Sequence, residues 1–189
     1  MICTRLISAA WLLGLLVYAP TGAFPVSRAA ADCGRTVSGV QLCLASSGST
    51  LEVELRNVGE HDVTLNLGIV LANGKVQLPN RIAIKLTDAR GQTRLFRFAD
   101  KRYPAIAGRV DDYIVPLRTG STYTLQMTLD QFWCQETSEF SIPLLSGENY
   151  LTAQFEGAGA NAVNSDMPGI KLMNFWLGKA ESNVLMLHR

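Results

Sequence analysis

Ile114-Val-Pro-Leu-Arg-Thr-Gly-Ser-Thr-Tyr123 and Ser141-Ile-Pro-Leu-Leu-Ser-Gly-Glu-Asn-Tyr150 show the same pattern twice. In each stretch an apolar run ends at Pro-Leu, a glycine permits a tight turn, and a tyrosine opens the next run. Such turns separate the strands of an antiparallel β-sandwich. The spacing from leucine through glycine to tyrosine is also that of a tyrosine corner, in which the phenol caps a backbone carbonyl. We therefore expect two corners shaped by Tyr123, Tyr150, Gly120 and Gly147.

Apolar residues alternate with polar ones from Val37 onward, and turn signals recur about every ten residues. In Leu51-Glu-Val-Glu-Leu-Arg-Asn57 the aliphatic residues face a core and the charged residues face water. Asn73-Gly74 and Asp88-Ala-Arg-Gly91 predict hairpin turns, since these residue types accept positive φ. The sequence predicts an all-β fold, a single antiparallel immunoglobulin-like β-sandwich with extra hairpins. The expected strands are 39–45, 50–57, 62–72, 75–79, 81–88, 93–98, 110–117, 121–129, 139–144, 148–156, 172–177 and 182–188.

The N-terminal segment has the pattern of a secretory signal peptide. Arg5 precedes an apolar run from Leu6 to Ala19, which is shorter than the ~18 residues that indicate a membrane span. Residues 1–31 are the expected signal peptide, with cleavage after Ala23 as the alternative, and residues 32–189 the expected single domain. We therefore expect a secreted or periplasmic protein with no membrane span in the mature chain.

The cysteines agree with an oxidising compartment. Cys3 lies in the expected signal peptide, which leaves Cys33, Cys43 and Cys134, an odd number. Cys43 alternates with inward-facing aliphatic residues, so its side chain should point outward, where the chain from Cys33 can fold back. We favour a Cys33–Cys43 disulfide with Cys134 free. A bridge from Cys134 to either partner stays open, because bridging depends on Cα separations of roughly 4.4 to 6.8 Å.

Charge is distributed unevenly along the chain. The formal net charge of +1 gives no general attraction to nucleic acid. Yet the stretch 81–109 is rich in arginine and lysine, whereas 119–170 contains acids and neither lysine nor arginine. The simpler explanation is cross-strand ion pairs, worth ~0.2 to 1 kcal/mol each. The alternative is a basic face for an anionic glycan, a lipid headgroup or an acidic protein.

Strand alternation identifies the residues of such a face. Counting from Ile82 puts Arg81 and Lys85 outward, and the returning strand brings Arg94 or Arg97 to the same side, depending on register. The candidate anion-binding residues are thus Arg81, Lys85, Arg94 and Arg97.

The order of several motifs from 37 to 188 also resembles a known group. These motifs are Arg56-Asn-Val-Gly59, Asn73-Gly74, Ala107-Gly-Arg-Val-Asp111, the repeated Pro-Leu-x-x-Gly-x-x-Tyr, Trp176-Leu-Gly178 and Ser182-Asn183-Val184. Together they resemble uncharacterised exported bacterial proteins with immunoglobulin-like or fibronectin III-like β-sandwiches. The resemblance implies fold and export. It implies no activity, because that group has no assigned reaction and a fold alone does not specify one.

Catalytic chemistry has little support in the sequence. His61 and His188 are the only imidazoles, and neither a GxSxG nor an HExxH motif accompanies them. Asp111 and Asp112 are adjacent and so point to opposite sides of a strand. Acids between Asp130 and 166 could gather around loops as in a carboxylate or metal-dependent hydrolase of the envelope, which is the runner-up. We expect no catalytic residues, no resident metal and no cofactor.

Two further hypotheses concern soft ligands and aromatic rings. Met186 and His188 share a strand face, and Met167 and Met173 lie in or near the loop 157–169. Such ligands suit Cu(I) in a periplasmic copper protein. Bunched aromatic residues could form a carbohydrate or peptide platform, although they more often fill a core. These aromatics are Phe132, Trp133, Phe175 and Trp176.

The hypothesis that the sequence favours is an exported, non-catalytic binding or scaffold module. Its expected partner is an unknown protein or an anionic surface polymer. The envelope hydrolase and the copper-binding protein remain the alternatives.

Overall fold

The computed structural model describes residues 32–71, 75–99, 110–160 and 173–189. The fold is an all-β antiparallel sandwich, as the sequence predicted, and the described residues contain one short 3₁₀ turn, η1 (Leu129–Gln131), and no α-helix. The expected signal peptide and the Asn73-Gly74 turn lie outside the described residues. The strands are β1 (Val40–Ser47), β2 (Thr50–Asn57), β3 (Val63–Leu71), β4 (Val76–Leu78), β5 (Ile82–Thr87), β6 (Thr93–Phe98), β7 (Val110–Leu117), β8 (Thr122–Thr128), β9 (Phe132–Cys134), β10 (Glu139–Phe140), β11 (Glu148–Glu156) and β12 (Lys179–His188).

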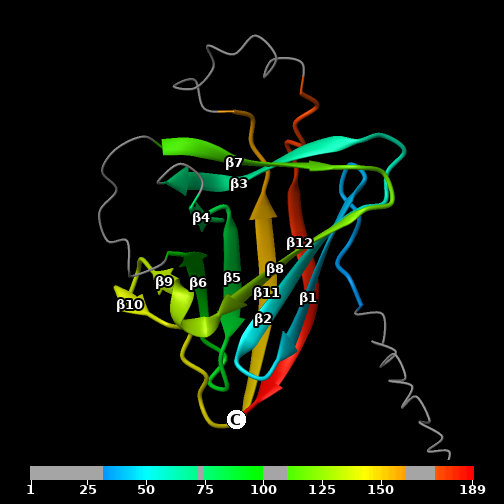
Figure 1. Cartoon of the computed structure of the whole chain (residues 1–189). Helices are drawn as coiled ribbons and strands as arrows, with labels where there is room; N and C mark the ends of the chain where they lie inside the picture. The colour runs from blue at the N-terminus through cyan, green and yellow to red at the C-terminus, as the bar shows by residue number, and fades with distance from the viewer. Residues whose placement is uncertain (1–31, 72–74, 100–109, 161–172) are drawn as a thin grey trace, which may run out of the picture.

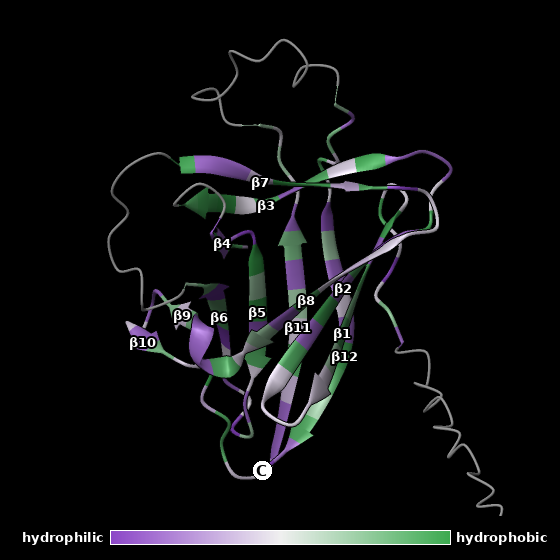
Figure 2. Cartoon of the chain, viewed as in Figure 1, coloured by the Kyte–Doolittle hydropathy of each residue, from purple (hydrophilic) through white to green (hydrophobic). Residues whose placement is uncertain are grey.

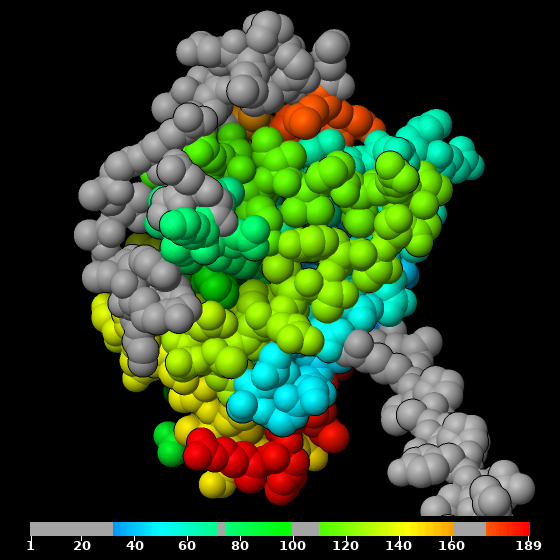
Figure 3. All heavy atoms as spheres, viewed as in Figure 1, coloured from blue at the N-terminus to red at the C-terminus, as the bar shows by residue number. Residues whose placement is uncertain are grey.

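The strands form three antiparallel sheets. Sheet A has the order β1-β2-β8, sheet B the order β4-β3-β7, and sheet C the order β10-β9-β6-β5-β11-β12. Sheet A lies in front of β11 and β12, while β3 and β7 run across the upper end of sheet C (Figure 1). In the space-filling view β7 and β8, in yellow-green, cover the middle of this near side (Figure 3). Sheet C therefore has one face toward the core and one face on the far side of this view.

The core lies between sheets A and C, and alternate residues of β11 point into it. Along β11, Leu151, Ala153 and Phe155 are buried. Figure 2 shows the resulting change of hydropathy from residue to residue along this strand. Fully burying a large aliphatic or aromatic side chain contributes about 1.5 to 3 kcal/mol, so this inward row holds the two layers together. Other fully buried members are Leu42, Leu44, Leu51, Leu55, Leu65, Leu67, Ile82, Ile84, Leu86, Phe96 and Phe132.

Trp176 closes one end of the core and does not belong to a strand. Its ring stacks on Phe155 at a centroid distance of 5.3 Å, and its Nε1 donates to the Val37 carbonyl at 3.0 Å. A Cβ added at Gly157 or Gly178 would lie 2.4 Å from a carbon of this indole. The expected strand 172–177 is therefore wrong over its described residues. Only an isolated bridge between Thr64 and Phe175 forms there. The indole of the next residue lies between two glycines, which have no side chain to collide with it.

The stretch after β8 also differs from expectation. The expected strand 139–144 is reduced to the two-residue β10, and an unexpected strand, β9, pairs with β6. Ser138 and Ser141 have φ of 55° and 77°, which interrupts extended backbone on both sides of β10. Pro143 lacks the N–H that a longer strand would use.

Both turns have the expected glycine, but a side chain other than the expected tyrosine caps the backbone of each turn. Gly120 and Gly147 have φ of 74° and 108°, as the turns require. At the first corner Asn57 Nδ2 donates to the Leu117 carbonyl at 3.0 Å, and the Gly120 N–H donates to the Asn57 carbonyl at 2.8 Å. At the second corner Asn149 Nδ2 donates to the Leu145 carbonyl at 2.8 Å. Buried asparagines therefore cap both corners.

The expectation that Tyr123 and Tyr150 cap these corners is wrong. Tyr150 points outward because Leu151 and Asn149 on either side are buried, and its phenol donates to the Glu148 carboxylate. That hydrogen bond is the main reason why the pKa of Tyr150 is raised. Tyr123 does point inward, but its phenol bonds to that of Tyr113 at 2.6 Å. Burial is the main cause, and this bond the next, of a pKa of Tyr113 far above its usual value.

Cys33 and Cys43 form the expected disulfide, with an S–S distance of 2.05 Å and a Cα–Cα distance of 4.3 Å. Cys134 is free and buried. Cys43 is only 1% exposed, because the returning segment 33–37 covers its side of β1 with hydrogen bonds such as that from the Gly34 N–H to the Leu42 carbonyl. The bridge thus fastens the start of the described chain to sheet A.

Candidate anion-binding face

The register of sheet C decides which of the candidate cations share a face. Ala83 pairs with Arg97 and Lys85 pairs with Leu95. Directly opposed residues project from the same side of a sheet, so Arg97 lies on the outer face of sheet C with Lys85. The sequence prediction that Lys85 faces outward is confirmed by this pairing. Arg81 precedes β5 and lines the same two hollows as Arg97.

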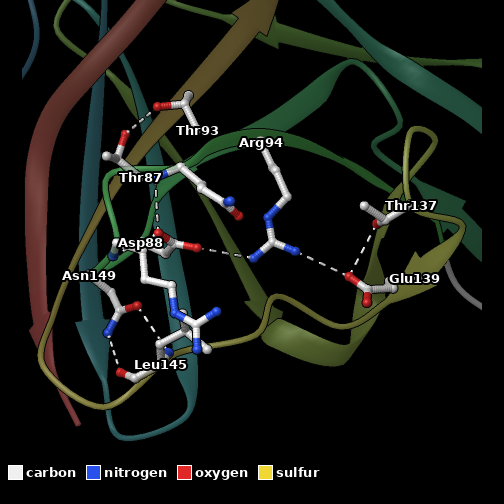
Figure 4. A network of polar contacts seen from close by, with 10 residues as sticks. Thr87, Asp88, Thr93, Arg94, Thr137, Glu139, Leu145 and Asn149 are labelled. Carbon is white, nitrogen blue, oxygen red and sulfur yellow. Dashed lines mark hydrogen bonds and ion pairs between the residues drawn. The ribbon is translucent and has the colours of Figure 1, made fainter.

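Arg94 does not belong to this outer face. It pairs with the buried Leu86, and Figure 4 shows its guanidinium pointing between Asp88 and Glu139. The distances are 3.6 Å from Nη2 to Asp88 Oδ2 and 3.2 Å from Nη1 to Glu139 Oε2. Arg94 also lies 5.6 Å from the centroid of the Phe96 ring. Its role is structural, because it neutralises the buried Asp88 at the end of the core.

The outer face carries a groove between its cations. Two adjoining hollows of about 220 and 310 Å³ share Arg81, Arg97 and Glu156 as lining residues. Ala83 forms the floor and is only 6% exposed, although it points outward. Because the alanine side chain is short, the longer side chains around it leave a depression above it. The remaining lining residues of the two hollows are Gly68, Ile69, Asn80, Leu95, Gln154, Phe155, Lys179, Ala180 and Glu181.

Arg81 occupies the point where sheet B meets sheet C. Its N–H donates to the Leu67 carbonyl at 3.2 Å, and its carbonyl accepts from the Glu156 N–H at 3.4 Å. These bonds hold the Arg81 backbone at the groove, just before β5 begins. Its Nε atom is buried and has no hydrogen-bond partner among the described residues. The guanidinium is therefore not fully satisfied by the protein itself.

The four cations of the outer face differ in their partners. Lys179 Nζ lies 3.2 Å from Glu156 Oε1, and Lys85 Nζ lies 4.0 Å from Glu181 Oε1. Cross-strand pairing with acids, the simpler explanation from sequence, thus holds for these lysines. Among the described residues, no carboxylate lies within ion-pair distance of Arg81 or Arg97. These two arginines are the cations left for a ligand. Lys179 was not among the candidates, because its place beside Arg81 depends on the pairing of β11 with β12.

The aromatic residues divide between core and surface. Phe132 and Trp176 are buried, 0% and 3% exposed, as the core interpretation expected. Trp133 is half-buried and directly opposes Arg97, so it lies on the outer face of sheet C. Phe140, which the sequence reasoning missed, opposes Trp133 in turn and is 46% exposed. The alternation Phe132-Trp133-Cys134 is the sequence signal that could have predicted a strand here with Trp133 on its outer side.

The acids proposed for hydrolase chemistry are dispersed over separate partners. Glu139 pairs with Arg94, Glu148 accepts from Tyr150, and Glu156 pairs with Lys179. Asp112 accepts from the buried Asn66 at 3.1 Å. In the part of the chain that the structure describes, no three His, Cys, Asp or Glu side chains gather as a metal site.

Met186 and His188 share the outer face of β12, as the copper hypothesis requires. They oppose Tyr150 and Glu148, and Met186 is 57% exposed. Met173 is exposed as well, and Met167 lies outside the described residues. The one free cysteine among the described residues, Cys134, is buried.

A separate hollow of about 370 Å³ lies where Trp176 meets the β2–β3 turn. Its lining includes His61 and Glu60 but no lysine or arginine. Exposed Leu177 stands at its rim. This hollow therefore offers no cation to an anionic ligand.

No helix among the described residues has the length and apolarity needed to cross a membrane. No protein-family model matches the chain, and no curated protein matches its sequence.

Proposed function

We propose that this protein is an exported, non-catalytic binding module that takes an anionic polymer on the outer face of sheet C. The observation that carries the proposal is the pair Arg81 and Arg97, which line one groove without carboxylate partners among the described residues. An arginine presents several N–H donors in a rigid fork that suits carboxylate, sulfate or phosphate groups. The Cys33–Cys43 disulfide is compatible with export.

Retention of the secreted protein on dextran sulfate at low salt tests this proposal. Exposed charges are screened over roughly 8 Å at physiological ionic strength, so the bound protein should elute as salt increases. The double variant Arg81→Ser/Arg97→Ser should elute at distinctly lower salt than the wild type. The matched control is Arg90→Ser/Arg118→Ser, which removes the same charge from exposed arginines elsewhere. Equal elution of the two double variants would refute the proposal, because net charge alone would then explain retention.

A further inference from the structure

One row on the outer face of sheet C combines two aromatic rings with polar and charged side chains. Cross-strand pairs align Phe140, Trp133, Arg97, Ala83, Gln154 and Glu181. Neighbouring strands are ~4.8 Å apart, so the five steps from β10 to β12 span roughly 24 Å. A ligand of several residues can therefore contact the rings at one end of the row, Arg97 beside them, and Gln154 and Glu181 at the other end.

The aromatic end of this row is open to a ligand. The rings of Trp133 and Phe140 have centroids 6.4 Å apart and planes inclined by 33°. Phe140 is 46% exposed, unlike Phe132 on the core face of the same hairpin. The adjacent cation, Arg97, is exposed. An aromatic surface that keeps this much exposure beside a cation is suited to an apolar ring face that also carries a negative group.

The polar part of the row supplies acceptors as well as donors. Gln154 Nε2 donates to Glu181 Oε1 at 2.7 Å, and Glu156 lies one row further along the groove. Carboxylates accept hydrogen bonds, while arginine and lysine only donate. A polyphosphate has no hydroxyl groups along its chain to donate to the two glutamates. A polyhydroxylated ligand with spaced negative groups uses both kinds of group.

We infer that the ligand of this face is an acidic polysaccharide. A sugar ring lies against Trp133 and Phe140, its carboxylate or sulfate pairs with Arg97 and Arg81, and its hydroxyl groups donate to Glu181 and Glu156. This inference rests on the proposed function and specifies the chemistry of the ligand. It distinguishes a glycan from an acidic protein, which has negative groups but no polyhydroxylated rings.

Calorimetric titration with two polymers of similar charge tests the inference. The probes are polygalacturonate, an acidic polysaccharide, and polyglutamate, an acidic polypeptide. Polygalacturonate should bind more tightly, and Phe140→Ala should weaken only that binding, by roughly two- to tenfold, the usual range for an aromatic contact. Leu177→Ala is the control, since it removes a side chain that is 71% exposed at the other hollow. Unchanged thermal unfolding of Phe140→Ala checks that the fold is intact.

The outcomes separate this inference from the proposed function. Equal affinity for both polymers, with Phe140→Ala unchanged, would overturn the glycan inference while the anion-binding function stands. Tighter binding of polyglutamate would also overturn it and favour an acidic protein partner. Binding of neither polymer at low salt would overturn the anion-binding function itself.

Discussion

The side-chain amide of Asn183 forms hydrogen bonds with both backbone groups of Leu44. Nδ2 donates to the Leu44 carbonyl at 3.0 Å, and Oδ1 accepts from the Leu44 N–H at 2.8 Å. The amide thus replaces a strand residue and joins β12, the last strand of sheet C, to β1 of sheet A. The bulge in the pairing of β11 with β12 makes this geometry accessible. Ser182 Oγ accepts from the Ala153 N–H at 2.8 Å and so satisfies a donor within the bulge.

Replacing Asn183 should open this junction. Asn183→Ala leaves two backbone groups of the buried Leu44 without partners, so we expect it to lower the free energy of unfolding by about 1 to 3 kcal/mol. Asn183→Asp should be destabilising too, because a carboxylate cannot donate to the Leu44 carbonyl. Urea unfolding measures both. The comparison is Gln126→Ala on exposed strand surface, and losses equal to that of this control would refute the role of Asn183.

The second corner should depend on Asn149 rather than on Tyr150. Asn149 is fully buried and bonds the Leu145 N–H, the Leu145 carbonyl and the Gly147 carbonyl. Asn149→Ala should therefore cost about 1 to 3 kcal/mol. Tyr150→Phe removes only an exposed bond to Glu148, so the change should stay within about 0.5 kcal/mol. Urea unfolding that showed the larger loss for Tyr150→Phe would restore the tyrosine corner.

Substitutions of Arg94 and Arg97 should have opposite effects. Loss of Arg94 should lower stability, and loss of Arg97 should weaken binding. Arg94→Ala leaves the buried Asp88 without its cation, so we expect a loss of about 1.5 to 3 kcal/mol in urea unfolding. Its retention on dextran sulfate should not change. Arg97→Ala should keep the stability within about 0.5 kcal/mol and elute earlier. Equal effects of both variants on retention would contradict the assignment of Arg94 to the core side.

The thiols should react in two stages. Cys134 is completely buried, so it should resist alkylation in the native protein. In denaturant without reductant, Cys134 should be the only one of the cysteines at 33, 43 and 134 that is labelled. Reduction should then add Cys33 and Cys43. Intact mass measures the count, and labelling of all three cysteines without reductant would exclude the disulfide.

Alkaline pH should destabilise the protein through Tyr113. Its folded pKa is raised above the usual 10.0, chiefly by burial. Above that value the unfolded state loses the proton while the folded state keeps it, so the free energy of unfolding falls as pH rises. Tyr113→Phe should flatten this decline between about pH 9 and 11. Urea unfolding at several pH values measures it, and an unchanged slope in Tyr113→Phe would exclude the effect.

Local patterns in the sequence were sufficient for most of the fold. Alternation and turn residues predicted β1–β8 and β11 within a few residues, because side-chain direction in a strand follows directly from its period of two. The same rule put Lys85 on the outer face. It also supported the Cys33–Cys43 bridge, since the two residues lie close in the chain.

Contacts between distant residues decided the rest. A one-residue change of register between β5 and β6 would exchange the faces of Arg94 and Arg97, and no local pattern specifies that register. The row from Phe140 through Trp133 to Arg97 likewise exists only because β9 pairs with β6. Asn183 appeared in the sequence as part of a motif, but its partner Leu44 is far away in the chain. The sequence by itself determined where most strands lie and that side chains alternate along them, and only the tertiary structure decided which face of a sheet Arg94 and Arg97 take and which residues meet, because pairing energy comes from neighbours across strands.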